Sequence, residues 1–151
     1  MELYLFENLL KARDEAELTQ TAQHIAEKLG FDYFCYALSY RKSGEPSPQH
    51  FTLGTYPEIW LDRYFSEGFV NIDPSVLQCF RSTIPVIWTH RMFSAPKVID
   101  MHHEAGSIGI RGGVCLPIHS PWLNGAGLVG LANGEDTDKA VPHVVDTLGK
   151  A

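Results

Sequence analysis

The sequence predicts an α/β/α sandwich, in which helices cover both faces of a central antiparallel sheet of about five strands. Helical spacing of apolar residues runs through residues 3–29, before the first expected strand, and returns in residues 55–80. Residues 112–119 and 127–133 alternate like paired strands, and Asn124-Gly125 between them is a strong signal for chain reversal. Helices that both precede and interrupt antiparallel strands are expected to pack on the two faces of one sheet.

Length and composition predict one globular domain that spans residues 1–151. The chain is 44% apolar and 20% charged, which is ordinary for a globular protein long enough to bury its own core. Its 18 acidic and 12 basic residues give a net charge of −6, which argues against a nucleic-acid-binding surface in this chain. No apolar run is long enough to span a membrane and no signal-peptide pattern is present, so the expected location is the cytoplasm, without membrane attachment.

The three cysteines, Cys35, Cys79 and Cys115, are far apart and lie in apolar surroundings. Their odd number and wide spacing argue against a disulfide framework. They are therefore predicted to be buried free thiols in a reducing compartment.

The first forty residues predict two helices and a strand. Residues 3–10 form a short helix with one apolar face, and Asp14 can cap a second helix that Gly30 ends in the C′ position. The strand at residues 31–40 is rich in aromatic residues and largely apolar on both faces, so it is expected to be covered on both sides. The apolar face of the first helix consists of Leu3, Phe6, Leu9 and Leu10, and that of the second of Leu18, Ala22, Ile25, Ala26 and Leu29.

A turn-rich loop at residues 41–50 leads to a short strand at residues 51–54. Thr55 is expected to cap the next helix, because Glu58 follows at capping-box spacing and Pro57 suits a first helical turn. Further elements are expected at residues 74–80 (helix), 84–88 (strand), 96–105 (helix ended by Gly106) and 141–148 (closing helix), while Gly68 ends the helix that begins near Thr55.

Three aromatic residues with polar groups follow Thr55 at four-residue spacing. Tyr56, Trp60 and Tyr64 would lie along one face of the predicted helix. The ordinary interpretation is an aromatic core, but buried Tyr and Trp usually need a hydrogen-bond partner for the hydroxyl or the indole N–H. Three such groups together need three partners or one shared polar guest.

Asp73, which precedes Pro74 at the start of the next predicted helix, adds a carboxylate acceptor. Its simplest role is an N-cap that accepts the N–H of Ser75 or Val76. Together with the aromatic donors and the surrounding aliphatic residues, it also fits a site for a small ligand with an apolar body and a polar head. Both interpretations stay open at this point.

The pattern Tyr56-Pro57-x-x-Trp60-x-x-x-Tyr64, followed by Asp73-Pro74 and Trp88, resembles the autoinducer-binding domain of LuxR-type quorum-sensing regulators. The resemblance covers roughly residues 18–133. Any one of these dipeptides is common, but the ordered set is fairly specific. Further matching segments are Leu29-Gly30-Phe31-Asp32-Tyr33, Gly54-Thr55-Tyr56-Pro57, Glu104-Ala105-x-x-x-Gly109-Ile110-x-x-Gly113 and Leu116-Pro117-Ile118.

The resemblance implies a receptor domain for an N-acyl-homoserine lactone, with no other cofactor, that acts in transcription regulation as a homodimer. It implies that the Trp60 indole binds the lactone carbonyl, that Asp73 accepts the ligand amide N–H, and that Tyr64 binds the acyl carbonyl with help from Tyr56. The full set of implied ligand-binding residues is Tyr56, Trp60, Tyr64, Asp73, Val76, Trp88, Phe93, Met101 and Ala105.

The chain departs from the family pattern in three places. Gly130 stands where family members often carry Ser or Thr, which leaves space and removes a hydroxyl near the acyl carbonyl. Gly112-Gly113 is loose for a strand and predicts a bulge at the pocket rim. The helix-turn-helix domain of the family is absent from this chain, so DNA is expected to be bound only through such a domain in a longer regulator; a stand-alone sensor is the other possibility.

Enzymatic function is poorly supported, and neither a catalytic residue nor a metal site is predicted. No His-x-x-x-His, Cys-x-x-Cys or Gly-x-Ser-x-Gly motif occurs. Cys115 and His119, on one face of a predicted strand, form the remaining candidate pair. Two alternative functions stay open: a sensor of the same sandwich type for another small amphiphile, and an enzyme that hydrolyses such a ligand.

Overall fold

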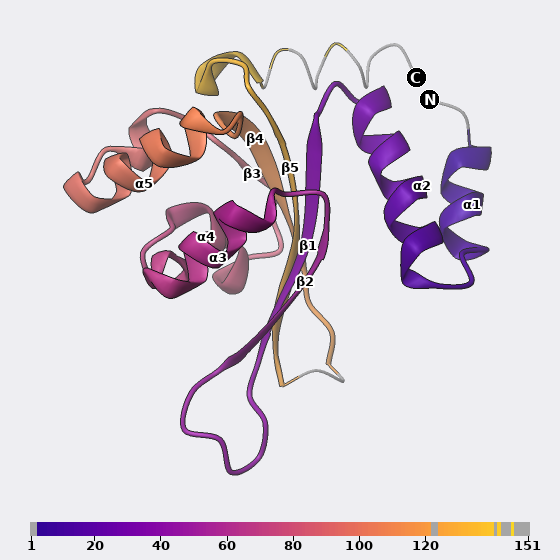
Figure 1. The fold of residues 1–151 in the computed structure, drawn as a ribbon, viewed down its shortest axis with the longest axis horizontal. Coiled ribbons are helices and arrows are strands. Elements are labelled where there is room, and N and C mark those ends of the chain that lie inside the picture. The colour runs from indigo at the N-terminus through magenta and orange to yellow at the C-terminus, as the bar shows by residue number, and fades with distance from the viewer. Residues whose placement is uncertain (1–2, 122–123, 141, 143–145, 147–151) are drawn as a thin grey trace.

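The computed structural model describes residues 3–121, 124–140, 142 and 146. It contains a five-stranded antiparallel sheet with the strand order β2-β1-β5-β4-β3. Helix α2 lies on one face of this sheet with α1 beyond it, and α3, α4 and α5 lie on the other face (Figure 1). The predicted α/β/α sandwich is therefore confirmed. The closing helix predicted at residues 141–148 lies almost wholly outside the described residues.

The strands are β1 (Tyr33–Tyr40), β2 (Gln49–Gly54), β3 (Val86–Ile87), β4 (Gly112–Ile118) and β5 (Gly125–Asn133). The α-helices are α1 (Tyr4–Leu10), α2 (Glu15–Lys28), α3 (Glu58–Ser66), α4 (Pro74–Arg81) and α5 (Pro96–Ser107). Short 3-10 helices occur at η1 (Phe69–Asn71), η2 (Arg91–Phe93) and η3 (Thr137–Lys139). None of the described helices has the length and apolar character needed to cross a lipid bilayer.

The strand register divides the core into two parts. Residues directly opposite each other on antiparallel strands point to the same face. Cys35, Gly130 and Cys115 are paired in this way and face α3, α4 and α5. Phe34 on β1 and Val114 on β4 face α2, where they form a small cluster with Ala26 and Phe31. The larger cluster, around Trp60 and Trp88, lies on the other face.

Helix α2 follows the local sequence signals. The Asp14 side chain accepts a hydrogen bond from the backbone N–H of Glu17 at 2.8 Å, as an N-cap should. Gly30 follows the helix with φ +91°, the left-handed conformation expected at C′. The predicted cap and the predicted end of this helix are both confirmed.

The apolar face predicted for α1 is not buried in the structure. Leu3, Phe6 and Leu10 are 73%, 44% and 89% exposed, and the buried residue of this helix is Leu5. The physical reason is that α1 packs beside α2 and does not reach the sheet (Figure 1). A short helix against a single neighbour buries only the side that faces that neighbour.

The capping box predicted for α3 is also wrong. The helix begins at Glu58 with Pro57 as its N-cap, and no side chain caps it. The Thr55 hydroxyl instead donates to Gln23 Oε1 at 2.6 Å and accepts the N–H of Phe34 at 3.0 Å. These contacts from α2 and β1 engage Thr55 before it can cap the helix.

Two glycine predictions need correction. Helix α5 continues through Gly106 to Ser107, and the reversal occurs at Gly109, which has φ +92°. No bulge forms at Gly112-Gly113, because both residues pair in regular register with β5. A Cβ atom at Gly113 would lie 3.0 Å from the Trp88 ring, so glycine at this position allows Trp88 to pack on the strand.

Candidate functional site

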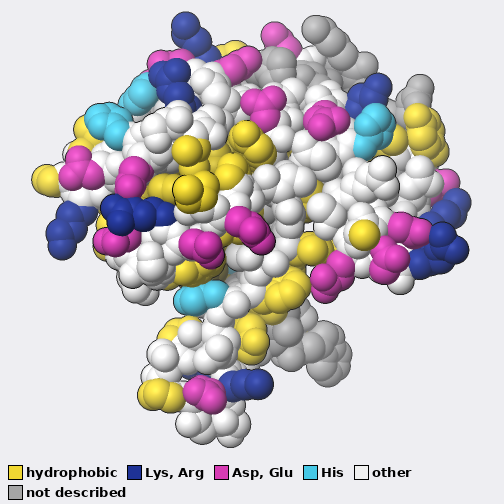
Figure 2. Space-filling view, viewed as in Figure 1, with side chains coloured by type: hydrophobic (Ala, Val, Ile, Leu, Met, Phe, Trp, Pro, Cys, Tyr) yellow, Lys and Arg dark blue, Asp and Glu magenta, His cyan; other side chains and the backbone are white. Residues whose placement is uncertain are grey.

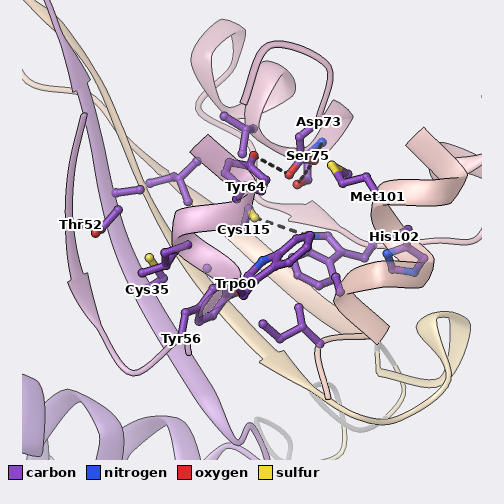
Figure 3. Close-up of a pocket in the computed structure, with 18 of the residues that line it drawn as sticks. Cys35, Thr52, Tyr56, Trp60, Tyr64, Asp73, Ser75, Met101, His102 and Cys115 are labelled. Atoms are coloured by element: carbon purple, nitrogen blue, oxygen red, sulfur yellow. Dashed lines mark hydrogen bonds between the residues drawn. The ribbon is translucent and has the colours of Figure 1, made fainter. Parts of the chain in front are cut away.

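A cavity lies between the sheet and helices α3, α4 and α5 (Figure 3). Its volume is about 80 Å³. All nine residues predicted to bind a ligand line this cavity, although they come from separate segments of the chain. The structure therefore brings the predicted set together. Most of the lining is apolar, with a few polar groups among the rings, which is typical of a small-molecule site.

The aromatic residues do not form one helical stripe as predicted. Tyr56 precedes α3, and its ring packs against Tyr33 with the ring centroids 6.4 Å apart. Only Trp60 and Tyr64 lie on the helix, where their rings meet edge to face at 5.8 Å. The three side chains still reach the same cavity, because the chain turns into the helix just after Tyr56.

Asp73 combines the two roles that its sequence position allows. It is the N-cap of α4, and Oδ1 accepts hydrogen bonds from the Ser75 backbone N–H at 3.0 Å and the Ser75 hydroxyl at 2.7 Å. Oδ2 accepts the Tyr64 hydroxyl at 2.8 Å and lines the cavity (Figure 3). A carboxylate has about four lone-pair sites. Asp73 therefore retains acceptor capacity on Oδ2 after these three bonds.

Burial and hydrogen bonds have opposite effects on the pKa of the Asp73 carboxyl. Asp73 is 8% exposed, and burial raises the pKa of its carboxyl above the ordinary value. The hydrogen bonds from Ser75 and Tyr64 favour the ionised form and oppose that rise. The same burial, together with the nearby Asp73 carboxyl, raises the pKa of the Tyr64 hydroxyl well above its usual value, which keeps Tyr64 a proton donor.

The Tyr56 hydroxyl is buried and has no hydrogen-bond partner among the described residues. It lies beside Gly130 on β5, 2.9 Å from the position that a Cβ atom there would occupy. The space that the sequence predicted at Gly130 therefore holds the Tyr56 hydroxyl. An unsatisfied polar group of this kind is rare in a folded protein and calls for a physical explanation.

His102 also lines the cavity, and the sequence did not predict this. Its Nε2 lies 2.9 Å from the Thr137 hydroxyl, which itself donates to the Arg111 carbonyl at 2.8 Å. Since the single hydroxyl proton is used in that second bond, Nε2 of His102 carries a proton and donates. Its ring stacks on Phe93 with centroids 4.0 Å apart. Burial, followed by the nearby His90, His103 and Arg111, lowers the pKa of His102 to about 4.

The other lining residues that were missed are mostly strand residues of the inner sheet face. A signal for them existed in the alternation of β1 and β5, but choosing the correct face requires knowing which helices cover it. These residues are Cys35, Ala37, Thr52, Leu61, Phe65, Ser75, Ile110, Cys115 and Leu128.

The cysteines are buried and free, as predicted. Cys115 accepts a hydrogen bond from the Trp88 indole N–H, with 3.4 Å between Nε1 and Sγ. His119 does not activate Cys115, because its Nε2 donates to the Cys79 carbonyl at 2.7 Å. The candidate nucleophile pair considered from the sequence is therefore engaged in other contacts.

One group within the described part of the chain has the composition of a metal site. His90, Asp136 and Asp138 place one ligand atom each within 4.8 Å of one another at the surface. These groups already bond among themselves: Asp138 accepts the His90 backbone N–H at 2.9 Å, and Asp136 accepts that of Asp138 at 3.1 Å. The Arg111 guanidinium, 3.9 Å from Asp136, adds positive charge where a cation would have to bind. These contacts explain the cluster without a metal.

Comparison with known proteins shows to which family the chain belongs. The family model described as "Autoinducer binding domain" matches residues 14–147. The chain belongs to this family. As an autoinducer-binding domain it is homologous to LuxR-type quorum-sensing regulators, and the resemblance seen in its motifs is confirmed.

The curated relatives of this autoinducer-binding domain are named as transcriptional regulators and not as enzymes. Transcriptional activator protein AnoR of Acinetobacter nosocomialis is 32% identical over 109 residues, which cover 72% of this chain and 45% of AnoR. Transcriptional activator protein PhzR of Pseudomonas fluorescens is 29% identical over 140 residues, which cover 91% of this chain and 54% of PhzR. The chain spans about half the length of these curated relatives.

Solved structures share the fold. The LuxR family factor CepR2 of Burkholderia cenocepacia, described as N-acylhomoserine lactone dependent, matches with a TM-score of 0.75 and 22% identity over 96% of this chain and 88% of the chain in that crystal structure. The protein SdiA, in a structure described as a complex with octanoyl-rac-glycerol, matches with a TM-score of 0.74 and 18% identity over 97% of this chain and 64% of the chain in that structure. At these identities the likeness concerns the fold.

Proposed function

We propose that this autoinducer-binding domain binds an N-acyl-homoserine lactone in the cavity between the sheet and α3, α4 and α5. The observation that carries the proposal is the Tyr56 hydroxyl, which is buried in a mostly apolar cavity without a partner. A ligand carbonyl at this point would satisfy it. The apolar lining suits an acyl chain, and Asp73 offers the acceptor that the amide N–H of such a ligand needs.

We assign a role to each polar group from the contacts within the cavity. The Tyr64 hydroxyl already donates its proton to Asp73, so Tyr56 is the hydroxyl available to bind the acyl carbonyl. Asp73 Oδ2 accepts the amide N–H, and the Trp60 indole N–H binds the lactone carbonyl. Trp88, Phe93, Met101 and Ala105 pack around the lactone ring, while Val76 contacts the acyl chain.

The size of the cavity supports binding that is coupled to folding. At about 80 Å³ it is smaller than the roughly 300–1,000 Å³ of sites that hold drug-sized ligands. A ligand must therefore widen the space between the sheet and the helices, and its acyl chain then becomes part of the core. Ligand that binds only the folded state stabilises that state by mass action. In a longer regulator with a helix-turn-helix domain, this stabilisation would promote homodimerisation and DNA binding in the cytoplasm.

The test is a thermal-shift and calorimetry series with N-acyl-homoserine lactones of increasing chain length. We expect the melting temperature to rise with the best ligand and the affinity to vary with chain length, because each buried CH₂ contributes about 0.8 kcal/mol. Asp73→Asn should weaken binding at least about tenfold, since a hydrogen bond to a charged group contributes roughly 1.5–3 kcal/mol. Asp100→Asn, an exposed substitution on α5, is the matched control. Equal affinity of the folded Asp73→Asn and parent proteins would argue against the assigned role.

A second candidate ligand is an acylglycerol or a similar amphiphile. It is favoured by the fold shared with SdiA, whose structure is titled as a complex with octanoyl-rac-glycerol. The same cavity could hold an acyl chain with a hydroxyl head. Mass spectrometry of the molecules extracted from the purified protein distinguishes the two classes, and intact recovery of the ligand after incubation would exclude its hydrolysis.

A further inference from the structure

Part of the outer face of the sheet is apolar and lacks a covering helix among the described residues. Helix α2 packs on Phe34 and Val114, near one end of the strands. Towards the other end the register sets Tyr36, Val129 and Leu116 side by side on β1, β5 and β4. The next row contains Phe51, Leu38 and Ile118. We call these six residues the open sheet face.

The open sheet face is exposed to solvent. Phe51, Leu116 and Ile118 are 40%, 37% and 39% exposed, and the remaining three residues are partly buried. The Tyr36 and Phe51 rings pack against each other edge to face, with their centroids 6.4 Å apart. The six positions carry no charged residue. Contiguous apolar surface of this kind marks an interaction site.

Helix α1 presents a second apolar surface on the same side of the molecule. Leu3, Phe6 and Leu10 recur at helical spacing on one face and are 73%, 44% and 89% exposed. Figure 2 shows hydrophobic side chains exposed both along the strands below α2 and at the edge of the molecule beside α1. Helix α1 lies on the far side of α2, and residues 11–14 join the two helices closely (Figure 1). It therefore cannot cover the open sheet face of its own chain.

We propose that a second copy of this chain covers the open sheet face with its helix α1, and that the contact is reciprocal. A twofold axis would place the α1 of each copy on the open sheet face of the other copy. The dimer would then contain two identical α1–sheet contacts, and both apolar surfaces of each copy would be buried. With about 200 Å² for a large apolar residue, the exposed parts of these residues amount to roughly 700 Å² per protomer. A stable interface buries about 800 Å² per partner. These two surfaces would form the interface of the homodimer that the proposed function includes. The proposal rests on the proposed function only in assuming that a dimer forms.

The test is sedimentation equilibrium of the whole chain, with and without an N-acyl-homoserine lactone. Leu10→Glu places a charge on α1, and Ile118→Glu places one on the open sheet face. Each substitution should weaken dimerisation about tenfold or more, because a charge would be buried in an apolar contact. Ile59→Glu is the matched control, because Ile59 is 76% exposed on α3, on the opposite side of the sheet. Circular dichroism confirms that each variant is folded.

A mixing experiment tests the reciprocal geometry. In a mixture of Leu10→Glu and Ile118→Lys proteins, the heterodimer has one unaltered α1–sheet contact and one that pairs Glu with Lys. It should therefore form more tightly than either variant alone. A parent chain that stays monomeric in both conditions, an unchanged dimer in either variant, or absence of rescue would overturn the proposal. Ligand binding is measured separately by thermal shift, and its loss in the parent chain would count against the proposed function and not against the interface.

Discussion

At the scale of single residues, Tyr56 and Gly130 are the most informative pair. A buried hydroxyl without a partner costs about 1–3 kcal/mol of folding free energy. The absence of a side chain at Gly130 creates the room in which this hydroxyl lies. Such a cost is understandable if the hydroxyl is satisfied in the ligand-bound state. The Tyr56 hydroxyl oxygen therefore lowers the stability of the ligand-free protein and, in the proposed function, contributes to ligand binding.

Tyr56→Phe tests this conflict directly. Removal of the hydroxyl should leave the free energy of unfolding unchanged or raise it by about 1 kcal/mol, since no hydrogen bond among the described residues is lost. The same change should weaken ligand binding about tenfold, because the acyl carbonyl loses its donor. Urea denaturation and titration calorimetry measure the two effects. Tyr33→Phe, which alters the neighbouring ring, is the control.

Gly130→Ala should destabilise the domain by about 1–3 kcal/mol, which is typical of overpacking in a core. The new methyl group would lie 2.9 Å from the Tyr56 hydroxyl oxygen, which is too close without movement of the ring. The loss should be smaller in the Tyr56→Phe background, where that oxygen is absent. Urea denaturation of the four proteins in this double-mutant cycle gives the coupling energy. Equal losses in both backgrounds would show that the contact with the hydroxyl is not the cause.

At the scale of elements, local signals were reliable only where no tertiary contact competed with them. Asp14 and Gly30 were predicted correctly at the ends of α2, because a cap and a C′ glycine depend on residues within one turn. Thr55 has the sequence of a cap but bonds to Gln23 on α2 and to Phe34 on β1. These two bonds connect α2 and β1 to the segment between β2 and α3.

Thr55→Val should lower the free energy of unfolding by about 1–2 kcal/mol. The shape of the side chain is kept, but Gln23 Oε1 and the Phe34 N–H lose their partner. A double-mutant cycle with Gln23→Ala, followed by urea denaturation, measures the coupling. If Thr55 acted as a helix cap instead, the loss would be the same whether or not Gln23 is present.

At the scale of the whole molecule, His102 contributes to the loss of stability in acid. Its pKa is lowered from 6.5 to about 4, with burial as the first cause. Between these values the unfolded chain binds a proton that the native protein does not, so the free energy of unfolding falls as the pH drops. At 1.36 kcal/mol per pKa unit, the full effect is at most about 3 kcal/mol. Asp73, whose pKa is raised by burial, acts in the opposite sense over the acidic range.

Urea denaturation at pH 7 and pH 5 separates these contributions. The parent protein should lose stability at the lower pH, and His102→Phe should lose less, because the titrating ring is removed while Asp73 is retained. His24→Gln changes an exposed histidine on α2 and should behave like the parent. A His102→Phe protein with the parent's pH dependence would exclude His102 as the source.

The sequence by itself determined the fold class, the pairing of β4 with β5 and nine of the residues that line the cavity. Strand alternation and the ordered motif from Tyr56 to Trp88 depend on spacing along the chain, and spacing is written in the sequence. Only the tertiary structure decided which groups are free to act. Tyr64 bonds to Asp73, Tyr56 has no partner among the described residues, and α1 exposes the apolar face that its sequence predicts. The physical reason is that hydrogen bonds and burial depend on distances between segments that lie far apart in the chain.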